Sequence, residues 1–218
     1  MDIPLIIRTL PLVFVGFAAM VSLISFVRHY PLALQKLSLL WVLNFAVDLA
    51  GFIIRDRGEK NLWLYNIYFW IMYLALAYLF GTQIRSKGIQ KSIRWFYGSF
   101  PVVVIAQSII GGIMQLQSLV IVVGGVFIIF LGVSYFRQLY LSEDTMPITR
   151  DPWFWFSFGF LIHFGGTVPF LGMLNFLWAH YKGFTTFYYL YFCNLFTVLL
   201  NLLIITGFLC RRNYQKSL

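Results

Sequence analysis

Seven long apolar stretches, separated by short polar segments, constrain the fold of this chain more than any other feature. We place them at about residues 5–27, 37–54, 62–84, 95–114, 119–136, 153–178 and 187–210. An apolar run of about 18 residues or more is long enough to cross the hydrocarbon core of a bilayer as a helix. The pattern therefore predicts an all-α, polytopic membrane protein, with residues 1–218 forming a single seven-transmembrane-helix bundle.

The charged residues support this interpretation by their number and their position. They make up 11% of the chain, against about 25% in a typical soluble domain. The formal net charge of +9 does not indicate nucleic-acid binding, because the basic residues lie between the apolar stretches, at the expected membrane surfaces. The first apolar stretch is too long for a cleaved signal peptide, so we expect it to remain as a spanning helix.

The distribution of Lys and Arg predicts the orientation in the membrane. Alternate loops place eleven of the 16 basic residues on one side: Arg28, Lys36, Arg85, Lys87, Lys91, Arg94, Arg137, Arg150, Arg211, Arg212 and Lys216. The other side receives the remaining five: Arg8, Arg55, Arg57, Lys60 and Lys182. The side richer in positive charge is normally the cytoplasmic one. We therefore expect the N-terminus outside and the C-terminus in the cytoplasm.

The sixth apolar stretch has the most distinctive sequence. Asp151 and Pro152 are suited to the N-cap and the first position of a helix. Trp153 and Trp155 fit an aromatic belt at the membrane interface. His163 follows ten residues after Trp153, which at about 1.5 Å per residue places it near the bilayer midplane. We interpret it either as bonded to a neighbouring carbonyl or as part of a ligand or proton site. No second His or Cys stands at metal-ligand spacing.

The residues after His163 favour a cavity on this helix. Thr167 lies one turn further along the same face, and the small Gly166 beside it leaves space for water or a ligand. Pro169 should kink the helix and leave the carbonyl of Gly165 without its helical donor.

Asp48 is the only acidic residue well inside an expected helix. A bare carboxylate in hydrocarbon costs about 2.5–3.5 kcal/mol on insertion scales, so it needs a partner or water. Arg8 lies at a similar expected depth in the neighbouring helix, which makes Arg8–Asp48 a candidate ion pair. A different buried partner and a role in a binding site are the alternatives.

Several polar side chains share the outer half of the expected bundle. The candidate pocket residues are Asp48, Asn44, Asn66, Tyr68, Gln107, His163, Thr167 and Asn194. A water-filled pocket open to the outside would satisfy these groups together. Hydrogen bonds between neighbouring helices would satisfy them equally well. The sequence does not decide between a pocket and interhelical bonding.

No motif indicates a reaction or a bound cofactor. H-E-x-x-H, G-x-S-x-G and a phosphate-binding glycine loop are all missing. The last helix has no lysine for a retinal Schiff base. Cys193 and Cys210 stand 17 residues apart on one expected helix, or about 25 Å, too far to form a disulfide with each other. We predict no catalytic residue, no metal and no cofactor.

Weak motifs over most of the chain resemble a known group of proteins. They are Leu43-Asn44 with Asp48, Asn66-Ile67-Tyr68, and the pattern Pro152, Phe154-Trp155, Gly159, Leu161-Ile162 and Gly166-Thr167. The chain resembles small seven-helix proteins of Bacteroidota and the membrane sensor region of some bacterial histidine kinases. Those proteins would carry an aromatic residue in place of His163 and often an acid in place of Met72.

The resemblance implies a multi-pass protein of the bacterial inner membrane. Our leading hypothesis is a non-enzymatic sensor or accessory subunit that acts through a partner membrane or signalling protein, because the loops leave no room for a soluble output domain. The alternative is an intramembrane enzyme or carrier for a lipid or a small apolar molecule, which the outer polar cluster favours.

Overall fold

The computed structural model describes residues 5–142 and 147–210, with side chains from residue 9 onward. All regular secondary structure in this part of the chain is helical. Seven stretches are long and apolar enough to cross a membrane: Thr9–Val27, Leu32–Asp56, Leu62–Gln83, Lys87–Gly111, Ser118–Tyr140, Pro152–Gly172 and Lys182–Leu209. The predicted fold class, an all-α, multi-pass membrane protein, is confirmed.

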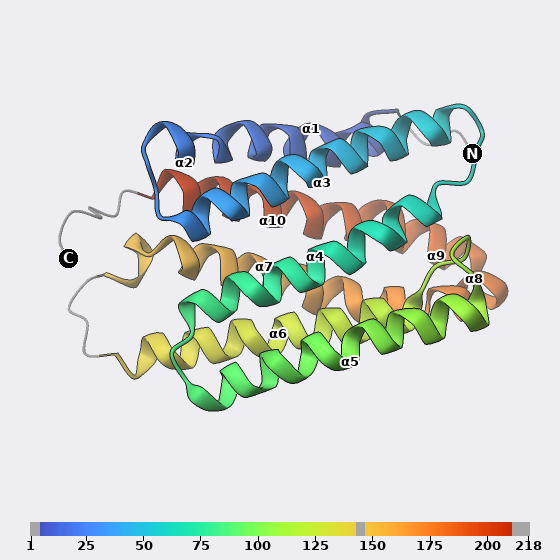
Figure 1. The fold of residues 1–218 in the computed structure, drawn as a ribbon. Helices are drawn as coiled ribbons and strands as arrows, with labels where there is room; N and C mark the ends of the chain where they lie inside the picture. The colour runs from blue at the N-terminus through green and yellow to red at the C-terminus, as the bar shows by residue number, and fades with distance from the viewer. Residues whose placement is uncertain (1–4, 143–146, 211–218) are drawn as a thin grey trace.

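Shorter helices accompany the main ones. In chain order the elements are α1 (Leu5–Ser22), α2 (Ile24–Val27), α3 (Leu32–Asp56), α4 (Leu62–Gln83), α5 (Lys87–Gly111), α6 (Ser118–Tyr140), the 3₁₀ turn η1 (Ile148–Arg150), α7 (Pro152–Gly172), α8 (Leu174–His180), α9 (Lys182–Tyr188), the π-helical turn η2 (Tyr189–Cys193) and α10 (Asn194–Leu209). Figure 1 shows the long helices running roughly along one direction.

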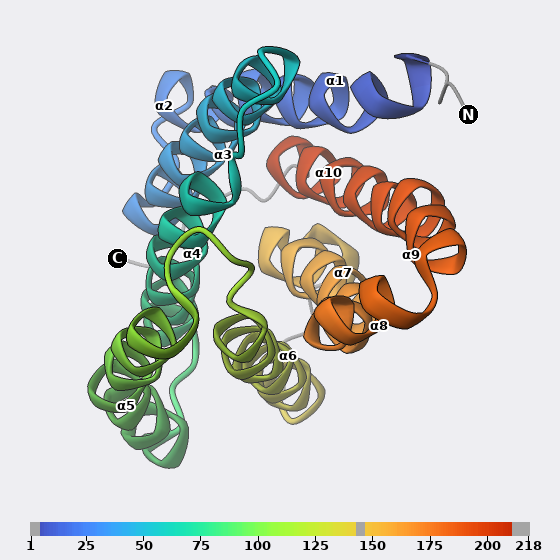
Figure 2. The same ribbon diagram turned by 90° about the vertical axis from the view of Figure 1, so that its right-hand side faces the viewer.

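Six of the long helices form a closed ring. Helix α1 packs on α3, α3 on α4, α4 on α6, α6 on α7, α7 on α10, and α10 back on α1. Helix α5 lies outside the ring and contacts α4 and α6 (Figure 2). Neighbours in this ring are therefore not always neighbours in sequence, since α1 meets α10.

Aromatic side chains fill much of the interior. Tyr73, Phe80, Phe100, Phe156 and Phe160 are all fully buried. Phe80 contacts Phe160 edge-on at a ring-centroid distance of 6.0 Å, and Tyr73 meets Phe100 in the same way at 5.9 Å. Such edge-to-face pairs add to the stabilisation from burial alone.

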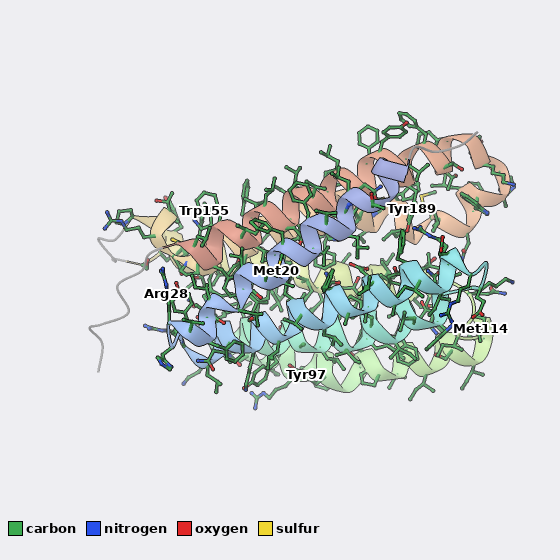
Figure 3. The ribbon with its side chains drawn as sticks, turned by 90° about the horizontal axis from the view of Figure 1, so that it is seen from above. Met20, Arg28, Tyr97, Met114, Trp155 and Tyr189 are labelled. Carbon is green, nitrogen blue, oxygen red and sulfur yellow. The ribbon has the colours of Figure 1, made fainter. Side chains whose placement is uncertain are left out.

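The outer surface is apolar where lipid is expected. On α5, Ile105 and Ile109 are 58% and 79% exposed. Met20 on α1 is 65% exposed, and Tyr97 on α5 lies near one edge of the bundle (Figure 3). An apolar surface this extensive is unusual for a soluble monomer and is what a bilayer covers.

Several expected helix ends differ from the observed ones: α3 begins at Leu32 instead of about residue 37, and the last span begins at Lys182 instead of about residue 187. The helix expected at 95–114 is α5, which begins at Lys87 and ends at Gly111, so most of the basic segment 85–94 is helical. Lys and Arg side chains at a helix end reach the membrane surface, so charge did not mark the helix boundary. The helix expected at 153–178 breaks at Met173 into α7 and α8, where the Met173 amide donates to the carbonyl of Phe170 at 3.1 Å in a tighter, 3₁₀-type turn.

The expectation for the start of the sixth span was partly right. The Asp151 carboxylate caps α7 by accepting from the Trp153 amide at 3.2 Å, and Pro152 takes the first helical position. The assignment of Trp153 to an interfacial belt was wrong: the side chain is only 3% exposed and packs against Phe80 and Phe156. Trp155 instead lies near the surface and donates its indole N–H to the carbonyl of Thr149 at 2.9 Å.

Candidate functional site

A cavity of about 720 Å³ lies inside the helix ring. Its walls come mainly from α3, α4, α7, η2 and α10, with a contribution from α6. This volume is typical of small-molecule sites, which occupy about 300–1,000 Å³. The cavity reaches the end of the bundle formed by the α3–α4 loop, the α5–α6 loop and α8 (Figures 1 and 2).

Most of the candidate pocket residues line this cavity. Six of the eight do so: Asn44 and Asp48 from α3, Tyr68 from α4, His163 and Thr167 from α7, and Asn194 from α10. They come from four helices, of which only α3 and α4 are consecutive in sequence, and the ring brings them together. Their role in binding a ligand stays a prediction.

Asn66 and Gln107 do not line the cavity. The Asn66 side-chain amide donates to the carbonyls of Ile113 and Gln115 at 2.8 and 2.7 Å, and its oxygen accepts from the Gln117 amide at 3.3 Å. The Gln107 oxygen accepts from the backbone of Val120 at 2.9 Å. For these two residues the interhelical-bonding alternative describes the structure, since both hold the α5–α6 connection in place.

Asp48 lies on the α3 wall, half-buried, with Tyr65 of α4 as its hydrogen-bond partner. Gly51, one turn after Asp48, makes this contact possible. A Cβ atom at Gly51 would lie 2.5 Å from the Tyr65 hydroxyl oxygen and 2.8 Å from its ring carbon. The missing side chain therefore lets the Tyr65 ring lie directly over α3 and direct its hydroxyl at the carboxylate.

The partner proposed for Asp48 in the sequence, Arg8, has a side chain outside the described residues, so the Arg8–Asp48 pair stays a prediction. Among the side chains that the structure does describe, no Lys or Arg forms an ion pair with Asp48. Tyr68 and Tyr189 are also close enough to interact with its charge. The described surroundings of this carboxylate are thus aromatic and hydroxylic rather than basic.

His163 belongs both to the cavity wall and to a helix contact. Its ring hydrogen-bonds with the backbone carbonyl of Phe196 on α10, and its buried Nδ1 has no partner among the described residues. The Thr167 hydroxyl donates to the His163 carbonyl at 2.7 Å.

The expected effect of Gly166 on the space beside Thr167 was wrong. Gly166 does not open space for water or a ligand, because the Phe196 ring occupies the position where its side chain would lie. At Gly165, in contrast, an added Cβ would meet nothing within 4 Å. The Tyr188 hydroxyl donates to the Gly166 carbonyl at 3.1 Å, one residue from the carbonyl that Pro169 leaves without a helical donor.

The π-helical turn η2 contributes residues that the sequence did not indicate. Tyr189 and Cys193, at its two ends, both line the cavity, as does Asn194 directly after it. The extra residue of a π turn changes which side chains face inward, and such turns are frequent at functional sites. Tyr191, in the middle of the same turn, is 48% exposed and does not line the cavity.

The inner end of the cavity is closed by a buried hydrogen-bond chain. The Trp41 indole N–H donates to the Asn201 side-chain oxygen at 2.9 Å, and the Asn201 amide donates to the Thr197 carbonyl at 2.8 Å. This chain ties α3 to α10 across the ring. Trp41, Thr197 and Asn201 all line the cavity, and their backbone-anchored contacts give it a fixed floor.

The opposite end of the cavity is polar and exposed. Lys60, Gln115, Asn175 and Trp178 line it there, and all four side chains are exposed. Figure 3 shows Met114 and Tyr189, which also line the cavity, toward this end, whereas Arg28 and Trp155 lie toward the other. Within the described residues, the side chains of Asn44, Tyr68 and Asn175 have no hydrogen-bond partner. These groups are available to water or to a ligand.

Neither the composition of the site nor its likeness to other proteins identifies a chemistry. In the part of the chain that the structure describes, no group of three or more His, Cys, Asp or Glu could hold a metal ion. Cys193 and Cys210 are not bonded to each other. Comparisons with protein-family models, with curated proteins and with solved structures find no match to this chain.

Proposed function

We propose that this chain is a bacterial inner-membrane protein that binds a small molecule in the ring cavity and acts as a sensor or accessory subunit through a partner protein. The observation that supports this function best is the cavity itself. It is mostly apolar and aromatic, opens at one end of the bundle, and holds polar groups that have no hydrogen-bond partner among the described residues. That combination is typical of a site for a small organic ligand.

The same cavity is compatible with the alternative, an intramembrane enzyme or carrier for a lipid or small apolar molecule. A sensor needs the cavity to bind and release a ligand while the helices change their packing, and it needs a partner that responds. Purification of the protein in lipid nanodiscs would distinguish the sensor from the enzyme. A stoichiometric partner protein together with an unchanged bound compound supports the sensor, whereas a compound that the purified protein converts supports the enzyme.

Access to the cavity is the first prediction. In a background lacking Cys193 and Cys210, we expect His163→Cys to react with a small, membrane-impermeant thiol reagent added from outside. Two further cysteine variants serve as the reactive and the unreactive control. His180→Cys, on the exposed end of α8, should react readily, and Ser157→Cys, fully buried on the same helix as His163, should not. A folded His163→Cys protein as unreactive as Ser157→Cys would contradict an accessible cavity.

The proposed orientation places the mouth of the cavity outside the cell, and this is the second prediction. Glu59→Cys in the α3–α4 loop should be labelled in intact cells, whereas Ser86→Cys in the α4–α5 loop should be labelled only after lysis. Both positions are exposed. Glu59 is a better probe than the neighbouring Gly58, whose φ of +79° would strain a cysteine. The reverse labelling pattern would invert the topology and place the mouth in the cytoplasm.

A further inference from the structure

We propose that the ring cavity takes an organic cation, a protonated or quaternary amine carried on an apolar body, with Asp48 as the counter-charge. This inference rests on the proposed ligand-binding function and names its ligand class. It is drawn from one juxtaposition: a carboxylate on the cavity wall, near Tyr65, Tyr68 and Tyr189 and facing a largely apolar interior.

The Asp48 carboxylate favours a positively charged ligand. Among the residues with described side chains, Asp48 hydrogen-bonds with Tyr65 and has no basic partner. A charged group at membrane depth is costly without a counter-charge, and such groups are usually paired or functional. A ligand that brings a positive charge into the cavity would provide a counter-charge that the described side chains do not supply.

The aromatic residues near Asp48 favour an ammonium group as the ligand's positive charge. Tyr65, Tyr68 and Tyr189 all lie close enough to interact with its charge, and all three line the cavity. The face of an aromatic ring carries negative electrostatic potential and attracts ammonium groups, and several rings beside one carboxylate form a recognised kind of site for them. Hydroxyl groups on these rings add hydrogen-bond acceptors for an N–H donor.

The remainder of the cavity determines the ligand body. Phe69, Met72, Phe160, Phe164 and Leu171 form a broad apolar wall from α4 and α7. Among the described residues that line the cavity, Lys60 is the only other fully charged one, and it lies at the exposed mouth, in the loop after α3. An anion would therefore be held at the mouth, whereas a cation with an apolar tail fits the interior.

Three probes that share one phenylbutyl body test this assignment: 4-phenylbutylamine, 4-phenylbutanol and 4-phenylbutanoate. Their binding to the full-length protein in nanodiscs is measured by calorimetric titration. We expect the amine to bind about tenfold more tightly than the alcohol, the size of a desolvated charge and cation–π contribution. Asp48→Asn should bring the two affinities together without weakening the alcohol. Asp56→Asn, a matched control on the exposed end of α3, should preserve the preference.

A second measurement needs no change at Asp48. In the Cys210→Ser protein, the amine should slow alkylation of Cys193 on the cavity wall more than the alcohol does at equal concentration. Equal binding and equal protection by amine and alcohol would overturn the cation assignment but leave the ligand-binding function intact. Tighter binding of 4-phenylbutanoate would also overturn the cation assignment and would indicate that Lys60 holds the charged group of the ligand. An amine preference seen only after Arg8→Gln would make Arg8 the counter-charge and overturn the assignment as well.

Discussion

Replacing Gly124 with alanine is expected to lower the free energy of unfolding by about 1–3 kcal/mol, the usual cost of overpacking a tight interior. Gly124 on α6 faces the ring of Tyr73 on α4, and an added Cβ would lie 2.5 and 2.6 Å from two ring carbons and closer still to a third. Van der Waals contact needs about 3.5 Å or more between carbons. One of the two helices would therefore have to move.

The Tyr73 ring cannot yield easily. It is 1% exposed and contacts the rings of Phe69, Phe100 and Phe164, and its hydroxyl donates to the carbonyl of Ile121 at 3.3 Å. Moving the ring would disturb contacts with α5 and α7 as well as α6. Because Tyr73 also lines the ligand cavity, the same substitution should weaken binding of any cavity ligand.

The stability change is measurable by unfolding in mixed micelles of increasing denaturing-detergent fraction. Gly98→Ala on α5 is the matched control, since an added Cβ there meets nothing within 4 Å, and it should cause no loss. Combining Gly124→Ala with Tyr73→Leu should cost less than the sum of the single changes, because the clash is then relieved. Strict additivity, or a loss from Gly98→Ala as large as that from Gly124→Ala, would contradict close α4–α6 packing as the cause.

Features that depend on residues close together in sequence could be predicted, whereas contacts between helices could not. The apolar runs were sufficient to find the seven spans, because length and hydropathy are local properties. The Asp151 cap was also predictable, because a cap bonds to a residue two positions away. Gly165 and Gly166 look alike in sequence, yet only Gly166 meets a ring of α10. Which glycine is packed depends on a helix contact that the sequence does not display.

In the cavity, too, only the properties that follow from position along a single helix could be predicted. Depth along each helix was enough to group six of its polar residues, since depth follows from counting at a fixed rise per residue. Lateral position was not predictable, because it depends on the order of the helices in the ring. Tyr65 was therefore missed as the partner of Asp48, although Gly51, one turn away on the same helix face, was a usable signal. Tyr189 and Cys193 carried no signal, because a π turn sets their direction.

Asn66 and Asn44 are both asparagines that the sequence placed in the candidate pocket, but of the two only Asn66 has hydrogen-bond partners among the described residues. This difference leads to the second large prediction. Asn66→Leu is expected to lower the free energy of unfolding by about 3 kcal/mol. Asn66 is only 1% exposed, and its side chain makes three hydrogen bonds to the backbone of residues 113, 115 and 117. Each buried polar group left without a partner costs about 1–3 kcal/mol, and partial access of water to the loop reduces the total.

The loop would lose more than these three bonds. The Gln117 side chain, which Asn66 helps to position through the backbone, accepts from the Trp70 indole and donates to the Ser108 hydroxyl, both at 2.8 Å. Through these contacts the α5–α6 connection is tied to both α4 and α5. Faster hydrogen exchange over residues 112–118 in the Asn66→Leu protein, with the spans still protected, would therefore accompany the loss of stability.

Asn44→Leu is the matched control, because Asn44 lines the cavity and has no hydrogen-bond partner among the described residues. We expect its stability to change by no more than about 1 kcal/mol, and any effect to fall on ligand binding instead. Asn66→Asp should lose at least as much as Asn66→Leu, since the carboxylate keeps the bond from the Gln117 amide but buries a charge against the two carbonyls to which it cannot donate. Equal losses from Asn44→Leu and Asn66→Leu would contradict the distinction, because a bonded and an unbonded asparagine would then contribute alike to the fold.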